Sequence, residues 1–172
     1  RSTLFPYTTL FRSNQRALDC HMINVIAVGK KHEDWVSGGI KRYQTRCKQP
    51  WSFEWQLIPH SKLDGQQARQ EESERILARL HPQDFVILLD ERGQMFDSPT
   101  LSRQLNELFV QGKNITIVIG GAFGVSAALT QRANLVWSLS PLVFPHQLVR
   151  LVLAEQLYRA QEIARGGKYH HQ

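Results

Sequence analysis

Two residues in the last third of the chain have types and spacing that suit chemistry on a bound ligand. His146 follows a mostly apolar loop from Leu139 to Pro145, and Arg150 lies one turn later on the same face of an expected helix. Such a loop suits an adenine ring, because its backbone amides reach the ring edge while its side chains exclude water. The alternative is that His146 simply begins or caps the helix, and the sequence leaves both interpretations open.

A glycine-rich turn, Ile119-Gly120-Gly121-Ala122-Phe123-Gly124, is the second candidate site. Glycines at the end of a strand let a ligand approach the backbone closely and meet unpaired N–H groups. The spacing is not the dinucleotide pattern G-x-G-x-x-G, and no P-loop lysine follows. The turn is therefore either part of a ligand site or a plain tight turn.

The tail from Gly166 to His171 is basic and aromatic. Tyr169 and His170 can stack on an exposed base while Lys168 meets a phosphate. A solvated terminus, or packing on a partner subunit, explains the same residues.

Elements that must position these residues follow from the hydrophobic pattern. Short apolar runs predict strands at 22–29, 85–89, 115–119 and 135–139, and alternation of apolar and polar residues predicts a half-buried strand at 53–57. Amphipathic stretches predict helices at 32–48, 65–80, 98–112, 126–133 and 145–165. The helix at 65–80 is expected to be mostly solvated. Alternation of strands and helices predicts a parallel sheet covered on both faces. Chemistry is then expected in the turns after Leu89, Ile119 and Leu139, at the carboxyl ends of the strands.

The composition describes one globular domain. The 172 residues are 42% hydrophobic and 21% charged, and no run approaches the roughly 20 apolar residues that a membrane-spanning helix needs. The formal net charge is +6. A basic balance of this size is compatible with an RNA partner but decides nothing alone.

The first segment, Arg1 to His21, shows neither helical nor strand period and lacks the apolar region of a secretory signal. Part of it looks like the translation of a sequencing adapter, so we expect a non-native extension at 1–21 and a single domain at 22–172. A genuine disordered extension is the alternative. Without the segment, 18 basic and 14 acidic residues leave a charge of +4, and Cys47 has no partner cysteine, which indicates a reducing, cytoplasmic compartment.

Several motifs occur together and in order along the chain. They are Met22-Ile23-Asn24-Val25-Ile26-Ala27-Val28-Gly29-Lys30, Leu89-Asp90 with Gly93, Ile119-Gly120-Gly121 with Gly124, Phe144-Pro145-His146-Gln147-Leu148-Val149-Arg150, Glu155-Gln156-Leu157-Tyr158-Arg159-Ala160, and Tyr169-His170. From Met22 to His171 the chain thereby resembles the RlmH family of the SPOUT superfamily. The resemblance implies an α/β fold in which a parallel sheet flanked by helices ends in a C-terminal trefoil knot, an exception to the rule that chains avoid threading loops.

The resemblance also implies a function. Members of the family methylate N3 of a pseudouridine in 23S ribosomal RNA, within the large subunit or the assembled ribosome, using S-adenosylmethionine. A cytoplasmic homodimer is implied, in which the tail of one subunit helps to complete the site of the other, with no metal and with neither membrane nor DNA as partner. Carried to this chain, the cofactor contacts are Leu89, Gly120, Leu139, Ser140, Pro141, Leu142, Val143 and Phe144, and the catalytic residues are His146, Arg150, Tyr169 and His170.

The chain departs from the family pattern at Gln94, Pro141, Val143 and His171. Backbone contacts should survive these changes, although Pro141 has no backbone N–H to donate. The departures leave open a non-catalytic RNA-binding or assembly protein of the same fold. A nicotinamide-dependent oxidoreductase fits poorly, because the glycine spacing is wrong and fold alone does not give function.

Overall fold

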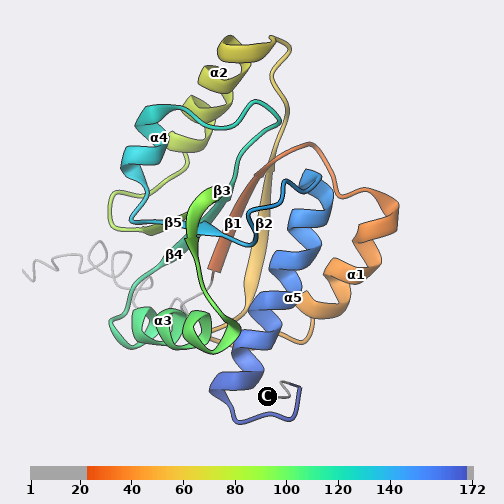
Figure 1. Ribbon diagram of the computed structural model, residues 1–172, viewed down its shortest axis with the longest axis vertical. Helices are drawn as coiled ribbons and strands as arrows, with labels where there is room; N and C mark the ends of the chain where they lie inside the picture. Colours follow the sequence, from red (N-terminus) through yellow and green to blue (C-terminus); the bar gives the residue numbers. More distant parts are fainter. Residues whose placement is uncertain (1–22, 170–172) are drawn as a thin grey trace, which may run out of the picture.

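The computed structural model describes residues 23–169, so the expected extension at 1–21 and the expected catalytic residue His170 lie outside the described residues. Within that range strands and helices alternate along the chain (Figure 1). The elements are β1 Ile23–Val28, α1 Asp34–Gln44, β2 Phe53–Ile58, α2 Gly65–Leu77, β3 Phe85–Met95, α3 Ser98–Val110, β4 Ile115–Ile119, α4 Ala127–Arg132, β5 Leu135–Ser138 and α5 His146–Ala164. The predicted order of strands and helices is confirmed, with shifts at the ends of elements.

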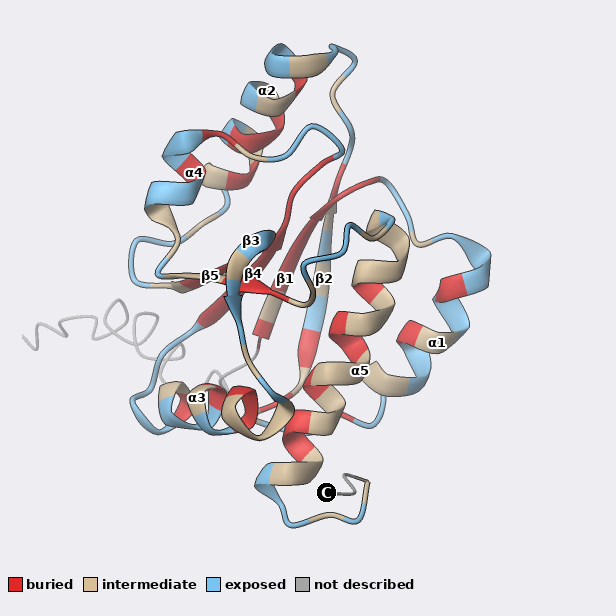
Figure 2. Cartoon of the chain, viewed as in Figure 1, coloured by how far each residue is buried: buried red, intermediate tan, exposed pale blue. Residues whose placement is uncertain are grey.

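The five strands form one parallel sheet in the order β2-β1-β4-β3-β5. Alternate residues of the strands face two separate cores. Ile23 and Val25 of β1 pack with α1, α3 and α5, while Ile26 and Val28 pack with α2 and α4. Figure 2 shows β1 and β4 coloured as buried along most of their length. Helices on both faces explain why these strands are continuous apolar runs.

The third strand is longer than predicted. The apolar run ends at Leu89, but β3 continues through polar residues to Met95. Both Leu89 and Gln94 pair with Trp137 of β5, so the segment between them leaves the ladder before the strand resumes. Gly93 permits this close approach, because a Cβ there would lie 2.7 Å from the carbonyl carbon of Val136. The hydrophobic pattern could not predict this extension, because its residues are mostly polar and are held to β5 chiefly by backbone pairing.

The expectation of a mostly solvated helix at 65–80 is wrong for one face of α2. That face buries Ala68, Glu72, Ser73 and Ile76. Ser73 Oγ accepts a hydrogen bond of 2.8 Å from the Ser126 N–H at the start of α4. Because the packed face carries polar side chains, counting apolar residues underestimated its burial.

Cys47 is 5% exposed and unpaired, and burial raises the pKa of its thiol to about 12. Since the thiolate is the reactive form, we expect Cys47 in the folded protein to resist iodoacetamide at about pH 8. Peptide mapping by mass spectrometry, with denaturant-unfolded protein as the control, measures its labelling separately from that of Cys20. Labelling of Cys47 at equal rates in folded and unfolded protein would contradict this placement.

Among residues 23–169, no helix is both long and apolar enough to cross a bilayer. The same residues contain no cluster of three or more His, Cys, Asp or Glu that could hold a metal ion.

Candidate functional site

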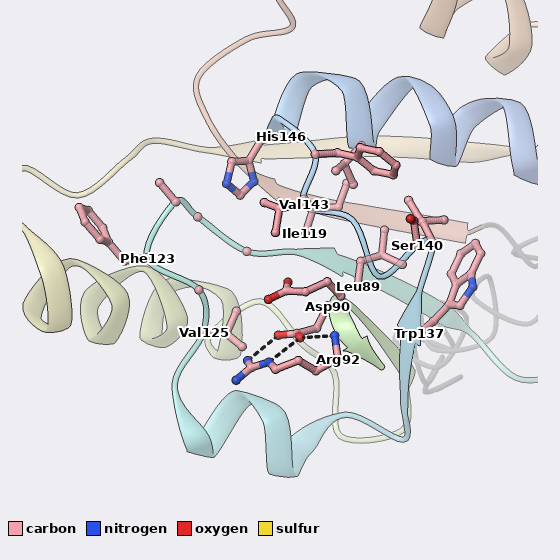
Figure 3. A pocket seen from close by; sticks show the side chains of 18 of the residues that line it. Leu89, Asp90, Arg92, Ile119, Phe123, Val125, Trp137, Ser140, Val143 and His146 are labelled. Atoms are coloured by element: carbon pink, nitrogen blue, oxygen red, sulfur yellow. Dashed lines mark hydrogen bonds and ion pairs between the residues drawn. The ribbon is translucent and has the colours of Figure 1, made fainter. Parts of the chain in front are cut away.

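A cavity of about 420 Å³ opens beside the middle of β3 and at the carboxyl ends of β4 and β5 (Figure 3). Three segments form most of its wall: residues 89–92 of β3, the glycine turn at 119–125, and the loop at 139–146 that leads into α5. These are the turns in which the parallel-sheet argument placed the chemistry. The volume lies within the range of small-molecule sites, roughly 300 to 1,000 Å³.

Most residues expected to contact a cofactor lie at this cavity. Leu89 and Gly120 line it from two strand ends, and the loop contributes Leu139, Ser140, Leu142, Val143 and Phe144. Pro141 does not line it. Leu142 and Val143 are 69% and 81% exposed, and Phe123 across the opening is 47% exposed. The mouth therefore carries an apolar rim suited to covering a flat ring.

Hydroxyl groups hold the loop in place. Ser138 Oγ lies 3.1 Å from the Glu91 carbonyl oxygen and 2.9 Å from that of Ser140. The Leu142 N–H in turn donates to Ser140 Oγ at 3.0 Å. The loop is thus joined to the extension of β3 on one side and closed on itself on the other, which fixes the wall against which a ligand would lie.

The glycine turn is compact. The Gly124 N–H donates to the Gly121 carbonyl at 3.0 Å, and Gly124 has φ +76°, a conformation that side chains other than glycine's rarely adopt. A Cβ on Gly120 would lie 2.6 Å from Val125 Cγ1, and one on Gly121 would overlap Glu72 Oε2. Glycine is therefore required at these positions by packing, whatever ligand is bound.

Charged residues that sequence reasoning did not single out also line the cavity. They are Arg69, Glu91 and Arg92, with Asp90 beside them. Arg92 donates from Nε and Nη2 to the Asp90 carboxylate at 2.9 and 2.8 Å, and these hydrogen bonds are the main reason that the pKa of Asp90 is lowered. For Asp90, Glu91 and Arg92 the available signal was their position directly after the third apolar run, whereas Arg69 on α2 had no such signal.

His146 lines the cavity at the first residue of α5. Its pKa is lowered chiefly by burial, then by Arg150 and His60, while Glu72 acts in the raising direction. The start of a helix also disfavours an added positive charge. His146 is therefore held in its neutral form near pH 7, and a neutral imidazole can accept a proton.

The structure places Arg150 away from the cavity. Arg150 is 1% exposed, and its guanidinium donates to the Val28 carbonyl at 2.7 Å and to the Lys31 carbonyl at 2.9 Å. It shares a helix with His146 as expected, but its donors tie α5 to the end of β1. The catalytic role that the resemblance implies for Arg150 gains no support from this geometry.

Tyr169 also lies apart from His146 within the chain. Its hydroxyl donates to Glu155 Oε1 at 3.3 Å, and the Arg159 guanidinium lies 4.8 Å from its ring centroid. Glu155 is nine residues beyond His146 on α5, or roughly 13 Å along the helix axis. In this arrangement Tyr169 does not reach the cavity of its own chain.

Comparison with known proteins gives consistent results. The family model described as "Predicted SPOUT methyltransferase" matches residues 22–170. The chain is 41% identical over 156 residues to "Ribosomal RNA large subunit methyltransferase H" of Desulfitobacterium hafniense (strain DSM 10664 / DCB-2), covering 86% of this chain and 98% of the relative. A protein of the same name from Thioalkalivibrio sulfidiphilus (strain HL-EbGR7) is 39% identical over 152 residues, covering 86% and 97%.

Among solved structures, the chain is similar to the SpoU methyltransferase AviRb from Streptomyces viridochromogenes in complex with the cofactor AdoMet. The sequence identity is 12% and the TM-score is 0.45, with 87% of this chain and 60% of that chain covered. This likeness is too distant to carry an argument.

Proposed function

The chain belongs to the SPOUT methyltransferase family, and from this premise we propose that it methylates N3 of a pseudouridine in 23S ribosomal RNA, using S-adenosylmethionine. The family also brings the trefoil knot expected from the sequence. The observation that carries the proposal is the cavity formed by β3 and by the loops that follow β4 and β5. The proposal is also supported by the named relative from Desulfitobacterium hafniense, which the chain matches over 98% of its length. Its apolar rim suits adenine, and its glycine turn leaves room for the rest of the cofactor.

S-adenosylmethionine would supply a methyl group on a positively charged sulfur. Transfer forms the bond between N3 and the methyl carbon, breaks the bond between that carbon and sulfur, and leaves the electron pair on sulfur. The N3 nitrogen is a poor nucleophile until its proton departs, so a nearby base assists. His146 is the residue we assign to this task, because it lines the cavity and is kept neutral. The other contribution of the protein is to hold the two reactants in line and exclude water.

The lowered pKa of His146 predicts a pH dependence. The turnover number at saturating cofactor should be constant near neutral pH and should fall as the pH drops below about 6.5 through the lowered pKa of His146, because the protonated ring cannot accept a proton. Rates measured from roughly pH 5 to 8 test this, with the pKa of His146 followed separately by NMR. In His146→Ala the remaining activity should lose this acid limb. Full turnover in that variant would remove His146 from catalysis.

We propose a homodimer in which the tail of one subunit, with Tyr169 and His170, reaches the cavity of the other. An apolar groove on the surfaces of α1 and α5, lined in part by Tyr43, Leu148 and Leu151, offers a face for a second copy. Trp35 on α1 is 60% exposed, which adds apolar surface near this face. Light scattering measures the association, and a truncation after Gly167 that left methylation intact would remove the tail from the site.

The proposed reaction is tested by incubating the protein with ribosomes and S-adenosylmethionine labelled in its methyl group. We expect label in large-subunit RNA, and nucleoside analysis by mass spectrometry should identify a methylated pseudouridine. Separate assays with free large subunits and with assembled ribosomes identify the form that is recognised. Cofactor binding without any transfer would favour the non-catalytic RNA-binding protein of the same fold. Since the substrate is ribosomal RNA, the cytoplasm is the proposed location.

A further inference from the structure

Glu72 on α2 is a buried acid to which the proposed reaction gives no task. It is 4% exposed. Its Oε1 accepts a hydrogen bond of 2.8 Å from the Ser61 N–H and lies 3.8 Å from His60 Nδ1. Its Oε2 is buried and has no hydrogen-bond partner among the described residues. Burying a carboxylate oxygen without a partner is costly, so this atom calls for an explanation.

The free oxygen lies directly behind the wall of the cavity. A Cβ added to Gly121 would overlap Glu72 Oε2 and lie 3.0 Å from its Cδ. Gly121 itself lines the cavity, and it belongs to the glycine turn whose residues Ile119, Phe123 and Val125 are labelled in Figure 3. Because Gly121 has no side chain, only backbone separates the carboxylate from the space that a ligand would fill.

Little in the surroundings neutralises this carboxylate. Its one ion-pair partner among residues 23–169 is His60, which is charged only when protonated and whose side chain is 60% exposed. The nearby Arg150 directs its guanidinium to the carbonyls of Val28 and Lys31 instead. The effect of Glu72 extends to the cavity, since it acts in the raising direction on the pKa of His146, which burial, Arg150 and His60 together lower.

The other charged residues of the cavity wall are ion-paired, exposed or positive. Asp90 is balanced by its hydrogen-bonded ion pair with Arg92. Glu91 is exposed, so water and salt screen it. Arg69 is positive and opposes binding of a cation. Glu72 is thus the buried acid behind this wall, and its ion-pair partner, His60, is positively charged only when protonated.

We propose that Glu72 makes the cavity selective for the sulfonium form of the cofactor over the neutral thioether that remains after transfer. The proposal rests on the proposed function. S-adenosylmethionine and S-adenosylhomocysteine share the adenosine and amino-acid parts and differ by the methyl group and the charge on sulfur. The α-ammonium and carboxylate groups are the same in both ligands, so a buried negative charge distinguishes them through the charge on sulfur, and at low effective dielectric such an attraction acts across several ångströms. Glu72 therefore favours exchange of product for fresh cofactor.

The test compares the affinities of both ligands in the wild-type protein and in Glu72→Gln. Glutamine keeps the size of the side chain and the acceptor for Ser61 but removes the charge. We expect the affinity for S-adenosylmethionine to fall roughly tenfold and that for S-adenosylhomocysteine to change less than about twofold, measured by calorimetry. Glu74→Gln, an exposed acid on the same helix, is the matched control and should leave both affinities unchanged.

Equal losses for both ligands in Glu72→Gln, or no loss for either, would overturn the proposal. Glu72→Asp keeps the charge and should preserve most of the selectivity; the same loss of selectivity as in Glu72→Gln would assign the effect to shape instead. Melting curves verify that each variant is folded. If the wild-type protein binds neither ligand, the proposed function fails, whereas normal wild-type binding with unchanged selectivity in Glu72→Gln refutes only the role of Glu72.

Discussion

Arg150→Ala is expected to lower the free energy of unfolding by about 3 kcal/mol. The substitution removes a fully buried side chain whose guanidinium donates to the carbonyls of Val28 and Lys31. Those two acceptors would lose their partners, and a hydrogen bond from a charged donor contributes more than a neutral one. The end of β1 would then separate from α5. Urea unfolding followed by circular dichroism measures the loss.

Two further variants make this prediction specific. Arg103→Ala removes an exposed arginine from α3 and should change stability by less than about 0.5 kcal/mol. Arg150→Lys keeps a cation but not the planar fork, so it should fall between wild type and alanine. If Arg150→Ala were as stable as wild type and instead lost only RNA binding, the substrate role expected from the sequence would return and the structural role would be wrong.

Gly121→Val is expected to weaken binding of S-adenosylmethionine by roughly tenfold to a hundredfold, with a loss of stability as well. The new side chain would overlap the Glu72 carboxylate, which is buried and accepts a hydrogen bond from the Ser61 N–H. Either this carboxylate must leave its place or the turn must shift toward the cavity that it lines, and both changes alter the wall of the site. Equilibrium dialysis with labelled cofactor measures the affinity.

Gly38→Ala is the matched control for that variant. Gly38 lies within α1, and an added Cβ would meet no atom within 4 Å. This substitution should leave cofactor affinity unchanged and should stabilise the helix slightly, because alanine favours helices over glycine. Cofactor affinity in Gly121→Val equal to that of Gly38→Ala would show that the glycine turn does not form the ligand site.

The order of elements was readable from the sequence because both sheet faces are covered. Strands β1 and β4 are buried on both sides, so each appears as an unbroken apolar run. The end of β3 was missed, since residues 90–95 are mostly polar and are held by backbone pairing with β5. The knot could not be found from hydrophobic period at all, because threading depends on the path of the chain in space and not on local pattern.

The loop and the glycine turn of the site could be predicted from the sequence, whereas the structural role of Arg150 and the burial of Glu72 could not. The loop at 139–144 and the glycine turn come together because they follow β5 and β4, the two parallel strands that flank β3 in the sheet. Arg150 has a charged side chain, and its position on the expected helix suggested a role with the substrate. No local pattern reveals that this side chain is buried and donates to the carbonyls of Val28 and Lys31. Glu72 was missed because its glutamine- and glutamate-rich helix is typical of a solvated one. Its packing behind Gly121, 49 positions later in the chain, depends on the fold and leaves no local signal.

The placement of Tyr169 connects the site to the proposed dimer. Within one chain the tail packs on Glu155 and Arg159, far along α5 from the cavity. If the tail has a part in catalysis, it acts on the partner's cavity, and mixed dimers of a tail-truncated subunit and a His146→Ala subunit should regain part of the activity. The two homodimers, assayed separately, are the controls.

Calorimetric titration of the whole protein with S-adenosylmethionine, beside an identical titration with NADH, tests the central claim most directly. The cavity described above predicts saturable binding of S-adenosylmethionine with one site per chain and no measurable binding of NADH. A folded protein that gives no heat with S-adenosylmethionine, or that prefers NADH, would contradict the assignment of this cavity as the methyl-donor site.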